Sequence, residues 1–175
     1  VGLQDQCRYD DFHKHRSELH KLWTGLSESG NAHDSTAYPA AGALVEEFPA
    51  VTSAARVDWT TQTILEVDNK DGVKVAGNEV DPTFLEVFEF PVREGQGKDA
   101  LQDKSNLVIT ESLAKSLFGE EEAIGKTVLL DNENPYIVTA VLADLPAHTQ
   151  FNFSFLIPLN KEPSNWNTFT YSTYV

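Results

Sequence analysis

The chain has 175 residues, of which 41% are hydrophobic and 23% are charged, and its formal net charge at pH 7 is −14. This size and composition indicate one folded domain or two small lobes rather than a disordered segment. The negative charge argues against nucleic acid and anionic lipid headgroups as partners, because both require a basic surface.

The first 35 residues are predicted to form a helix and a turn-rich connection. Phe12, Leu19 and Trp23 are spaced so that they would share one face of a helix over residues 10–23. Residues 25–35 are rich in glycine, serine, asparagine and aspartate, which favour turns.

A second helix is predicted to begin near Pro39, a residue that is favoured in the first helical turn. It should end before Pro49, because the residue that precedes a proline is pushed out of the helical region. A strand is expected over residues 53–59. The predicted buried face of the helix consists of Leu44, Val45 and Phe48.

The middle of the chain favours a hairpin followed by a short helix. Residues 60–77 hold two apolar runs on either side of a turn that ends in Asp-Gly, which is typical of a β-hairpin. In residues 82–90, Phe84, Val87 and Phe88 stand at positions i, i+3 and i+4. This spacing predicts a short helix with one buried face.

The strongest local signals lie between residues 107 and 119. Leu107–Ile109 is predicted to be a buried strand, Thr110 the N-cap of a helix, and Glu111 a first-turn acid that the helix dipole favours. Gly119 is expected to end this helix in a left-handed conformation. The buried stripe of the helix should consist of Leu113, Leu117 and Phe118.

The remainder is predicted to be mainly β-structure. Strands are expected over residues 127–130 and 136–142, joined by a polar turn. Residues 151–157 alternate so that Phe151, Phe153, Phe155 and Ile157 would share one apolar face of a strand.

The predicted fold class is α+β, with helices and strands near both ends and a mainly β middle. The two ends of the chain, residues 1–59 and 148–175, are expected to form one lobe. Residues 60–147 are expected to form a second, β-rich lobe inserted into the first.

The chain is expected to be part of a longer protein. It begins at Val1, contains no methionine at which translation could start, and shows no signal peptide. It also has no apolar run near the roughly 20 residues that a membrane-spanning helix requires.

Residues 119–127 superficially match a phosphate-binding loop. That motif has four residues between its glycines and leads from a strand into a helix. Here five residues separate Gly119 from Gly125, the segment is expected to follow a helix, and three glutamates would repel phosphate. We interpret the segment as a helix end and an acidic turn.

No other group of residues predicts catalysis or metal binding. His13, His15 and His20 lack a spacing that would place them together on one helical face. Cys7 is the one cysteine, which excludes an internal disulfide, and it has no evident partner histidine. A Gly-x-Ser-x-Gly elbow is absent, and 27 acidic residues make any chosen carboxylate pair uninformative. We therefore predict no catalytic residue, no cofactor-binding residue and no metal ligand, as in a protein that is not an enzyme.

The aromatic residues are interpreted as core rather than as a ligand site. This applies to Phe84, Phe88 and Phe90 and to the face from Phe151 to Phe155. Four aromatic residues near the C-terminus are expected to be exposed because part of their lobe is missing: Trp166, Phe169, Tyr171 and Tyr174.

Several blocks of the sequence follow one another in an order that is typical of a single family. Residues 8–13 are similar to S-Y-D-x-F-h, and residues 80–90 resemble D-x-x-F-F-x-V-F-x-F. Residues 100–119 resemble A-L followed by V-V-L-T-E-S-x-A-K-x-x-F-G, and Ile124–Thr127 comes next in the same order.

The last block, residues 136–146, resembles Y-x-V-x-G-V-x-x-D-x-P, with Ala140 in place of the glycine. Over residues 9–157 the chain thus resembles the MacB-like periplasmic core domains of ABC-transporter permeases, in particular those of Bacteroidetes. The family normally continues into a further helix and strand, so the terminal lobe is expected to be incomplete after Val175.

The resemblance implies a porter-like lobe built from both ends of the domain and an inserted Sabre-like lobe. It further implies a non-catalytic periplasmic domain of an inner-membrane protein, without a cofactor, that relays ATP-driven movement of membrane helices for efflux, extrusion or signalling. The implied partners are a second permease protomer in a homodimer, a cytoplasmic ATP-binding subunit or domain, and in some systems a periplasmic adaptor. Contact with the membrane would be made only by flanking transmembrane helices.

The main alternative is a soluble periplasmic module that binds a peptide, lipoprotein or small molecule between the two lobes. A cavity between the lobes with convergent polar groups would favour that alternative. A filled seam would favour the relay. An envelope hydrolase would need a nucleophile and a base within hydrogen-bond reach, and the sequence offers no such pair.

Overall fold

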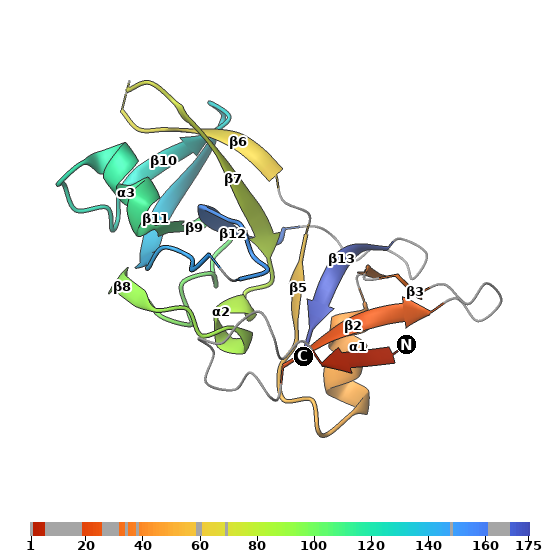
Figure 1. Ribbon diagram of the computed structural model, residues 1–175. Helices are drawn as coiled ribbons and strands as arrows, with labels where there is room; N and C mark the ends of the chain where they lie inside the picture. The colour runs from red at the N-terminus through yellow and green to blue at the C-terminus, as the bar shows by residue number, and fades with distance from the viewer. Residues whose placement is uncertain are drawn as a thin grey trace.

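Helices and strands are mixed along the chain, and the predicted α+β class is confirmed. The computed structural model describes residues 2–5, 19–25, 32–33, 35–37, 39–58, 61–68, 70–147, 149–160 and 169–175. Within these ranges the helices are α1 (Ala40–Glu47), α2 (Phe84–Val87) and α3 (Glu111–Phe118), set among mostly antiparallel strands (Figure 1).

Six of the described strands pair side by side until the last meets the first, and we call this closed set the strand ring. Its order is β7, β12, β9, β11, β10 and β6, and β6 pairs again with β7. Closure pairs backbone groups that an open sheet would leave at its edges. The ring strands are β6 (Thr61–Glu66), β7 (Val73–Val80), β9 (Asn106–Thr110), β10 (Thr127–Leu130), β11 (Asn134–Leu142) and β12 (Phe155–Pro158).

The inside of the ring is filled by apolar side chains. Five of the six ring strands contribute buried residues to one cluster, and the partly buried Val73 and Val75 of β7 pack against it. α3 adds its predicted stripe of Leu113, Leu117 and Phe118. The short strand β8 (Val92–Gly95) pairs with β11 on the outside. The predicted hairpin of β6 and β7, the strand β9, and the strands β10 and β11 are confirmed.

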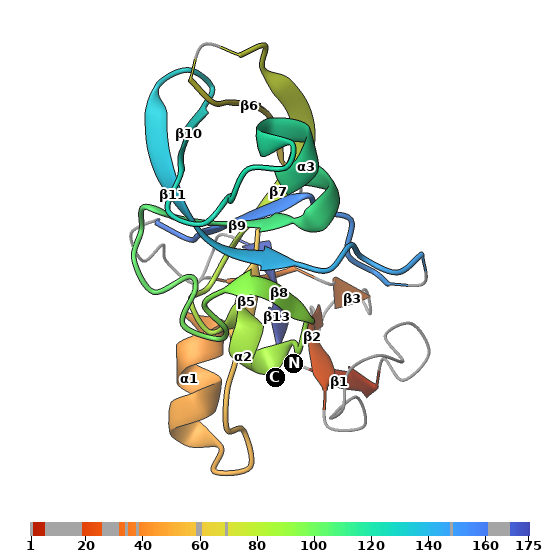
Figure 2. The ribbon, with the colours of Figure 1, turned by 90° about the vertical axis from the view of Figure 1, so that its left-hand side faces the viewer.

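The remaining strands extend from the ring, and we call them the terminal strands. β5 pairs with β7 at Val57 and Val80, and β13, β2 and β1 follow in that order. β1, β2 and the C-terminal end of β13 lie in the part of the molecule away from α3 (Figures 1 and 2). The terminal strands are β1 (Gly2–Asp5), β2 (His20–Gly25), β3 (Ala32–His33), β4 (Thr36–Ala37), β5 (Ala55–Val57) and β13 (Phe169–Tyr174).

The helix predicted over residues 10–23 is wrong at its C-terminal end, where the chain forms β2 instead. Lys21 pairs with Gln4 of β1 on one side and with Tyr174 of β13 on the other. Pairing with strands that are distant in sequence therefore outweighs the helical spacing. The rest of the predicted helix, residues 10–18, lies outside the described ranges.

The second helix is confirmed in its bounds, but its predicted buried face is wrong. α1 follows Pro39 and ends before Pro49, as expected. Val45 and Phe48 are nevertheless 42% and 52% exposed, and the buried residue of the helix is Ala41. An apolar stripe shows which side of a helix favours burial, but it does not supply the surface that buries it.

The strand predicted over residues 151–157 is shorter than expected and is buried on both faces. β12 begins only at Phe155, and all four of its residues are buried. Phe155 points into the ring core, whereas Leu156 points into a second core outside the ring. Because β12 lies between two cores, both of its faces are apolar. The alternation of apolar and polar residues in the sequence predicts only one of these buried faces.

The expected exposure of the C-terminal aromatic residues is also wrong where the structure describes them. Tyr171 and Tyr174 of β13 are both buried. The expectation for Trp166 and for the side chain of Phe169 falls outside the described part of the chain.

The helix α3 begins and ends where the sequence predicts, but its N-terminus is capped by a distant residue. Gly119 follows the helix with a φ of 65°, a value that glycine adopts without strain. Thr110 occupies the N-cap position, yet its side chain makes no capping hydrogen bond. Instead the carboxylate of Asp144 accepts hydrogen bonds from the Ser112 backbone N–H at 2.9 Å and from the Ser112 hydroxyl at 2.5 Å.

We expect Asp144→Ala to lower the free energy of unfolding by about 1 kcal/mol, the usual cost of losing an N-cap acceptor. Thr110→Val should change it by less than about 0.5 kcal/mol, because no capping bond is lost. Urea denaturation of both variants checks this pair. A larger loss of stability for Thr110→Val than for Asp144→Ala would show that Thr110 caps the helix.

Candidate functional site

The strand ring and the terminal strands meet around a cluster of buried rings, which we call the aromatic joint. The rings of Phe88 and Phe151 are 4.8 Å apart and those of Phe88 and Tyr174 are 5.0 Å apart, both edge to face. Phe84 lies 4.9 Å from Phe88. The joint consists of Phe84, Phe88, Phe90, Phe151, Phe153 and Tyr174.

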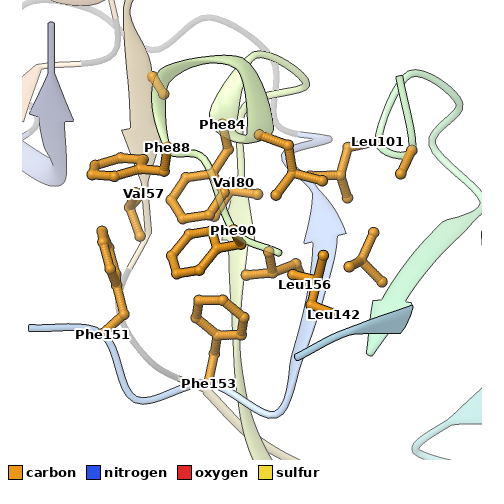
Figure 3. Packing of buried hydrophobic residues seen from close by; sticks show 14 of the residues in the cluster. Val57, Val80, Phe84, Phe88, Phe90, Leu101, Leu142, Phe151, Phe153 and Leu156 are labelled. Carbon is orange, nitrogen blue, oxygen red and sulfur yellow. The ribbon is translucent and has the colours of Figure 1, made fainter. Parts of the chain in front are cut away.

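The joint draws its residues from three separate parts of the chain. α2 and the residues after it supply three rings, the segment before β12 supplies two, and β13 supplies Tyr174. Figure 3 shows Phe151 and Phe153 facing the rings of Phe84, Phe88 and Phe90, with Leu142 and Leu156 of the ring strands beside them. The same cluster includes Ala55 and Val57 of β5, so it spans both sides of the junction.

The helix α2 is stabilised by this packing. At four residues it is far shorter than a helix that is stable by itself in water. Phe84 and Phe88 have no exposed surface, and the Phe88 N–H donates to the Phe84 carbonyl at 2.8 Å. Burial of two aromatic side chains therefore holds the turn, as the spacing of these residues predicts.

An ion pair joins β5 to the start of this segment. The guanidinium of Arg56 donates to both carboxylate oxygens of Asp81, at 2.7 Å from Nε and 2.6 Å from Nη2. The backbone N–H of Arg56 also donates to Asp81 at 2.8 Å. The two side chains are only 15% and 9% exposed. This fork-to-fork arrangement fixes distance and orientation together.

Further hydrogen bonds cross the same junction. The Thr83 hydroxyl donates to the Ala54 carbonyl at 2.6 Å, and the Asn78 side chain donates to the Asp58 carbonyl at 2.9 Å. The N–H of Asp81 donates to the Arg56 carbonyl at 3.0 Å. β5 is thus attached to β7 and α2 by backbone and side-chain bonds as well as by apolar packing.

These contacts make the junction a filled seam. Aromatic rings and aliphatic side chains occupy it, and both carboxylate oxygens of the Arg56–Asp81 ion pair accept hydrogen bonds. Such a junction transmits displacement because close-packed cores resist compression.

Within the described ranges, no three His, Cys, Asp or Glu side chains gather as metal ligands. No helix in the same ranges has the length and apolar character needed to cross a bilayer.

Of the segments that the sequence singled out for other chemistry, the structure describes residues 119–127 and His20, and the backbone of His20 pairs with Val175, next to Tyr174 of the joint. Residues 119–127 follow α3 and lead into β10, and Lys126 pairs there with Glu121 at 3.4 Å. His20 lies in β2 and His33 in β3. Outside the described residues are His13, His15, His148 and Cys7.

The aromatic core was predictable from the sequence, whereas the Arg56–Asp81 ion pair was not predicted. A signal for it was present, since Arg56 is the one charged residue between Ala54 and Val57. A charge in a strand that is otherwise buried requires a partner. That partner is Asp81, the first acidic residue in residues 80–90. No spacing rule links two residues that lie 25 positions apart.

Comparison with protein families gives one match over nearly the whole chain. A family model described as the MacB-like periplasmic core domain matches residues 9–175. No curated protein sequence matches the chain.

Three of the solved structures that match this chain share its fold over most of its length. A domain from Porphyromonas gingivalis, described as part of a permease, has a TM-score of 0.79 at 22% identity, covering 93% of this chain and 76% of that one. The periplasmic region of MacB from Actinobacillus actinomycetemcomitans has a TM-score of 0.64 at 18% identity, with 90% and 73% covered. The extracellular domain of YknZ, a noncanonical ABC-type transporter from Gram-positive bacteria, has a TM-score of 0.62 at 18% identity, with 89% and 81% covered. At these identities the likeness concerns the fold.

Proposed function

Because this chain belongs to the family of MacB-like periplasmic core domains, we propose that it relays ATP-driven movement of membrane helices to the periplasm. It is the periplasmic domain of an ABC-transporter permease, and such permeases work with an ATPase. In the proposed role the domain makes and breaks no covalent bond. It moves as a stiff body, and the movement serves efflux, extrusion or signalling.

The observation that carries this proposal is the filled junction. A relay needs displacement at one part of the domain to reach the other part without loss. The aromatic joint and the Arg56–Asp81 ion pair connect the terminal strands to the ring by packed rings and short hydrogen bonds. A binding module that acts through a cleft at this place would need an open cavity instead.

The position of the terminal strands supports the same proposal. β1 and the C-terminal end of β13 lie in the part of the molecule away from α3 (Figure 1). Membrane helices attached in that part would act directly on the terminal strands. The ring would then be the part that reaches into the periplasm.

We further propose two lobes, a porter-like one and a Sabre-like one, as the resemblance implies. From the sequence, the inserted lobe is expected to comprise residues 60–147. The pairing of β12 with β7 and β9 favours a second boundary after Pro158, which would keep the ring in one lobe. The proposed partners are a second permease protomer, a cytoplasmic ATP-binding subunit or domain, and a periplasmic adaptor.

Distance measurements in the full-length permease with its ATPase test the relay. In a variant with Cys7→Ser and no other cysteine, Glu120→Cys after α3 carries one spin label per protomer. Glu120 is exposed, so the label should leave the fold intact. We expect the distance between the two labels to differ by about 5 Å or more between the nucleotide-free and ATP-bound states, the scale of known switching movements.

A second label at Glu46→Cys on α1, also exposed, reports on the terminal strands. A stiff relay predicts that both label pairs respond to ATP. An ATPase subunit that cannot bind nucleotide serves as the control and should give one distance at each site. Unchanged distances in a permease that still hydrolyses ATP would contradict the relay and favour the binding module.

A further inference from the structure

A small hollow opens at one end of the strand ring. Its volume is about 180 Å³, and it is lined by β6, β7, β12 and the hairpin of β10 and β11. None of its lining residues belongs to the aromatic joint. An inference from the hollow therefore goes beyond the relay and does not depend on it.

One buried hydroxyl group in this hollow lacks a hydrogen bond. Thr63 of β6 lines the hollow and is only 5% exposed. Its Oγ1 has no hydrogen-bond partner among the described residues. Buried side-chain oxygens are nearly always paired with protein or with ordered solvent. The hollow is where a partner for this oxygen would lie.

The hollow also carries negative charge. Glu79 and Asp131 line it, and none of its lining residues is a lysine, arginine or histidine. The Thr63 hydroxyl is near enough to Asp131 to lower the pKa of that carboxyl, although it falls short of hydrogen-bond geometry. The Ile64 N–H, which donates to Asp131 at 3.1 Å, lowers this pKa further, and partial desolvation opposes both effects. The carboxylate is thus charged at neutral pH.

A tyrosine and three apolar side chains also line the hollow. Burial raises the pKa of Tyr136, and the charge of Glu79 raises it further, so the phenol stays protonated and neutral. Leu130, Phe155 and Ile157 supply buried apolar surface beside these polar groups. The hollow therefore offers hydrogen-bond acceptors and negative charge together with room for a short hydrocarbon.

We propose that this hollow binds a primary ammonium group on a short aliphatic stem, with Glu79, Asp131 and the Thr63 hydroxyl as its acceptors. An ammonium group has three donors and a positive charge, and its stem packs on apolar surface. An anion would be repelled by the two carboxylates. A divalent metal would need at least three close ligands, and the described residues provide no such group.

The stem and ammonium group belong either to a lysine side chain of a partner protein or to a free diamine. Two probes separate these sources: N-acetyl-lysine methylamide and 1,5-diaminopentane. The neutral control probe is 1-pentanol, which has a stem but no charge. Titrations at constant ionic strength are followed by the backbone amide shifts of Thr63, Asn78 and Tyr136.

We expect saturable shifts with a dissociation constant on the order of 1 mM for at least one amine, the weak end of the affinity scale. Glu79→Gln should weaken binding about tenfold and Thr63→Val about fivefold, because each removes one acceptor. Glu94→Gln on β8 removes an exposed carboxylate outside the hollow and should change binding less than about twofold. Thr63→Val should fold at least as stably as the parent chain, since it removes an unpaired buried hydroxyl group.

Binding of both amines would support the shared ammonium chemistry. Binding of the lysine derivative alone would support a protein partner, and binding of the diamine alone would support a free polyamine. The proposal is overturned if neither amine gives saturable shifts up to about 10 mM. It is also overturned if 1-pentanol binds equally well, or if Glu79→Gln and Thr63→Val bind the amines like the parent chain.

Discussion

Phe84→Ala is expected to lower the free energy of unfolding by about 3–5 kcal/mol, the usual cost of removing a fully buried phenyl ring. Phe84 has no exposed surface and lies at the centre of the aromatic joint, with four other rings between 4.9 and 6.2 Å away. Its loss leaves a cavity between the ring strands and the terminal strands. Since small domains are stable by about 5–15 kcal/mol, this loss is a large fraction of the total.

Urea denaturation followed by tryptophan fluorescence measures this effect. The midpoint should fall while the slope stays constant, as expected for lost packing without a change in exposed surface on unfolding. Phe48→Ala is the matched control, because the same side chain is removed from a position that is 52% exposed. We expect it to change stability by less than about 0.5 kcal/mol. Equal effects at the two positions would refute the burial argument.

Phe84→Leu separates packing from function. Leucine keeps most of the buried hydrocarbon, so the cost in stability should be smaller than for alanine. If the joint transmits movement, the leucine variant of the full-length permease should still fold and dimerise but should show a smaller ATP-dependent change in label distance. A variant that is stable and shows the full change would indicate that the joint serves stability alone.

Elements with strong local signals were predictable from the sequence. The hairpin of β6 and β7 follows from two apolar runs around an Asp-Gly turn. The helix α2 follows from the spacing of Phe84 and Phe88, and α3 from its apolar stripe and from Gly119 at its end. In each case the residues that determine the structure lie within about ten positions of one another.

Features that depend on distant partners were not predictable. β2 is a strand because it lies between β1 and β13, although its sequence has helical spacing. Val45 and Phe48 are exposed because the described part of the chain provides no surface that covers them. Asp144 caps α3 from 32 residues away, and no capping rule covers such a distance.

The same limit applies to the candidate sites. The aromatic residues of the joint were identified as core, since hydrophobicity is a local property. The pairing of Arg56 with Asp81 and the hollow beside Thr63 arise only when β5, β6, β7 and β12 come together. No local pattern in the sequence places these residues next to one another.

Asp81→Ala is expected to lower the free energy of unfolding by about 3–5 kcal/mol, the range for breaking a buried ion pair from one side. Arg56 would keep its charge in a site where its side chain is only 15% exposed. Its guanidinium would lose two hydrogen bonds to the carboxylate, and its backbone N–H would lose another. Thermal and urea unfolding measure the change.

Arg93→Ala is the control for this prediction. Arg93 pairs with Glu111 at 3.2 Å, but the two side chains are 56% and 44% exposed. Water screens such a pair, so its loss should cost less than about 1 kcal/mol. A similar loss of stability for Arg93→Ala and Asp81→Ala would show that burial of the Arg56–Asp81 pair has no energetic consequence.

The double variant Arg56→Met with Asp81→Leu distinguishes the cost of an unpaired charge from the loss of the ion pair that attaches β5 to the segment before α2. Because no charge is left unpaired, it should be more stable than Asp81→Ala, and it approaches the parent chain if the new side chains pack well. Apolar side chains do not fix orientation as a bidentate ion pair does. In the full-length permease this variant should therefore show less correlated movement of the labels on α1 and beyond α3, even where stability is restored. A stable double variant with unchanged label distances would restrict the ion pair to a structural role and leave transmission to the aromatic joint.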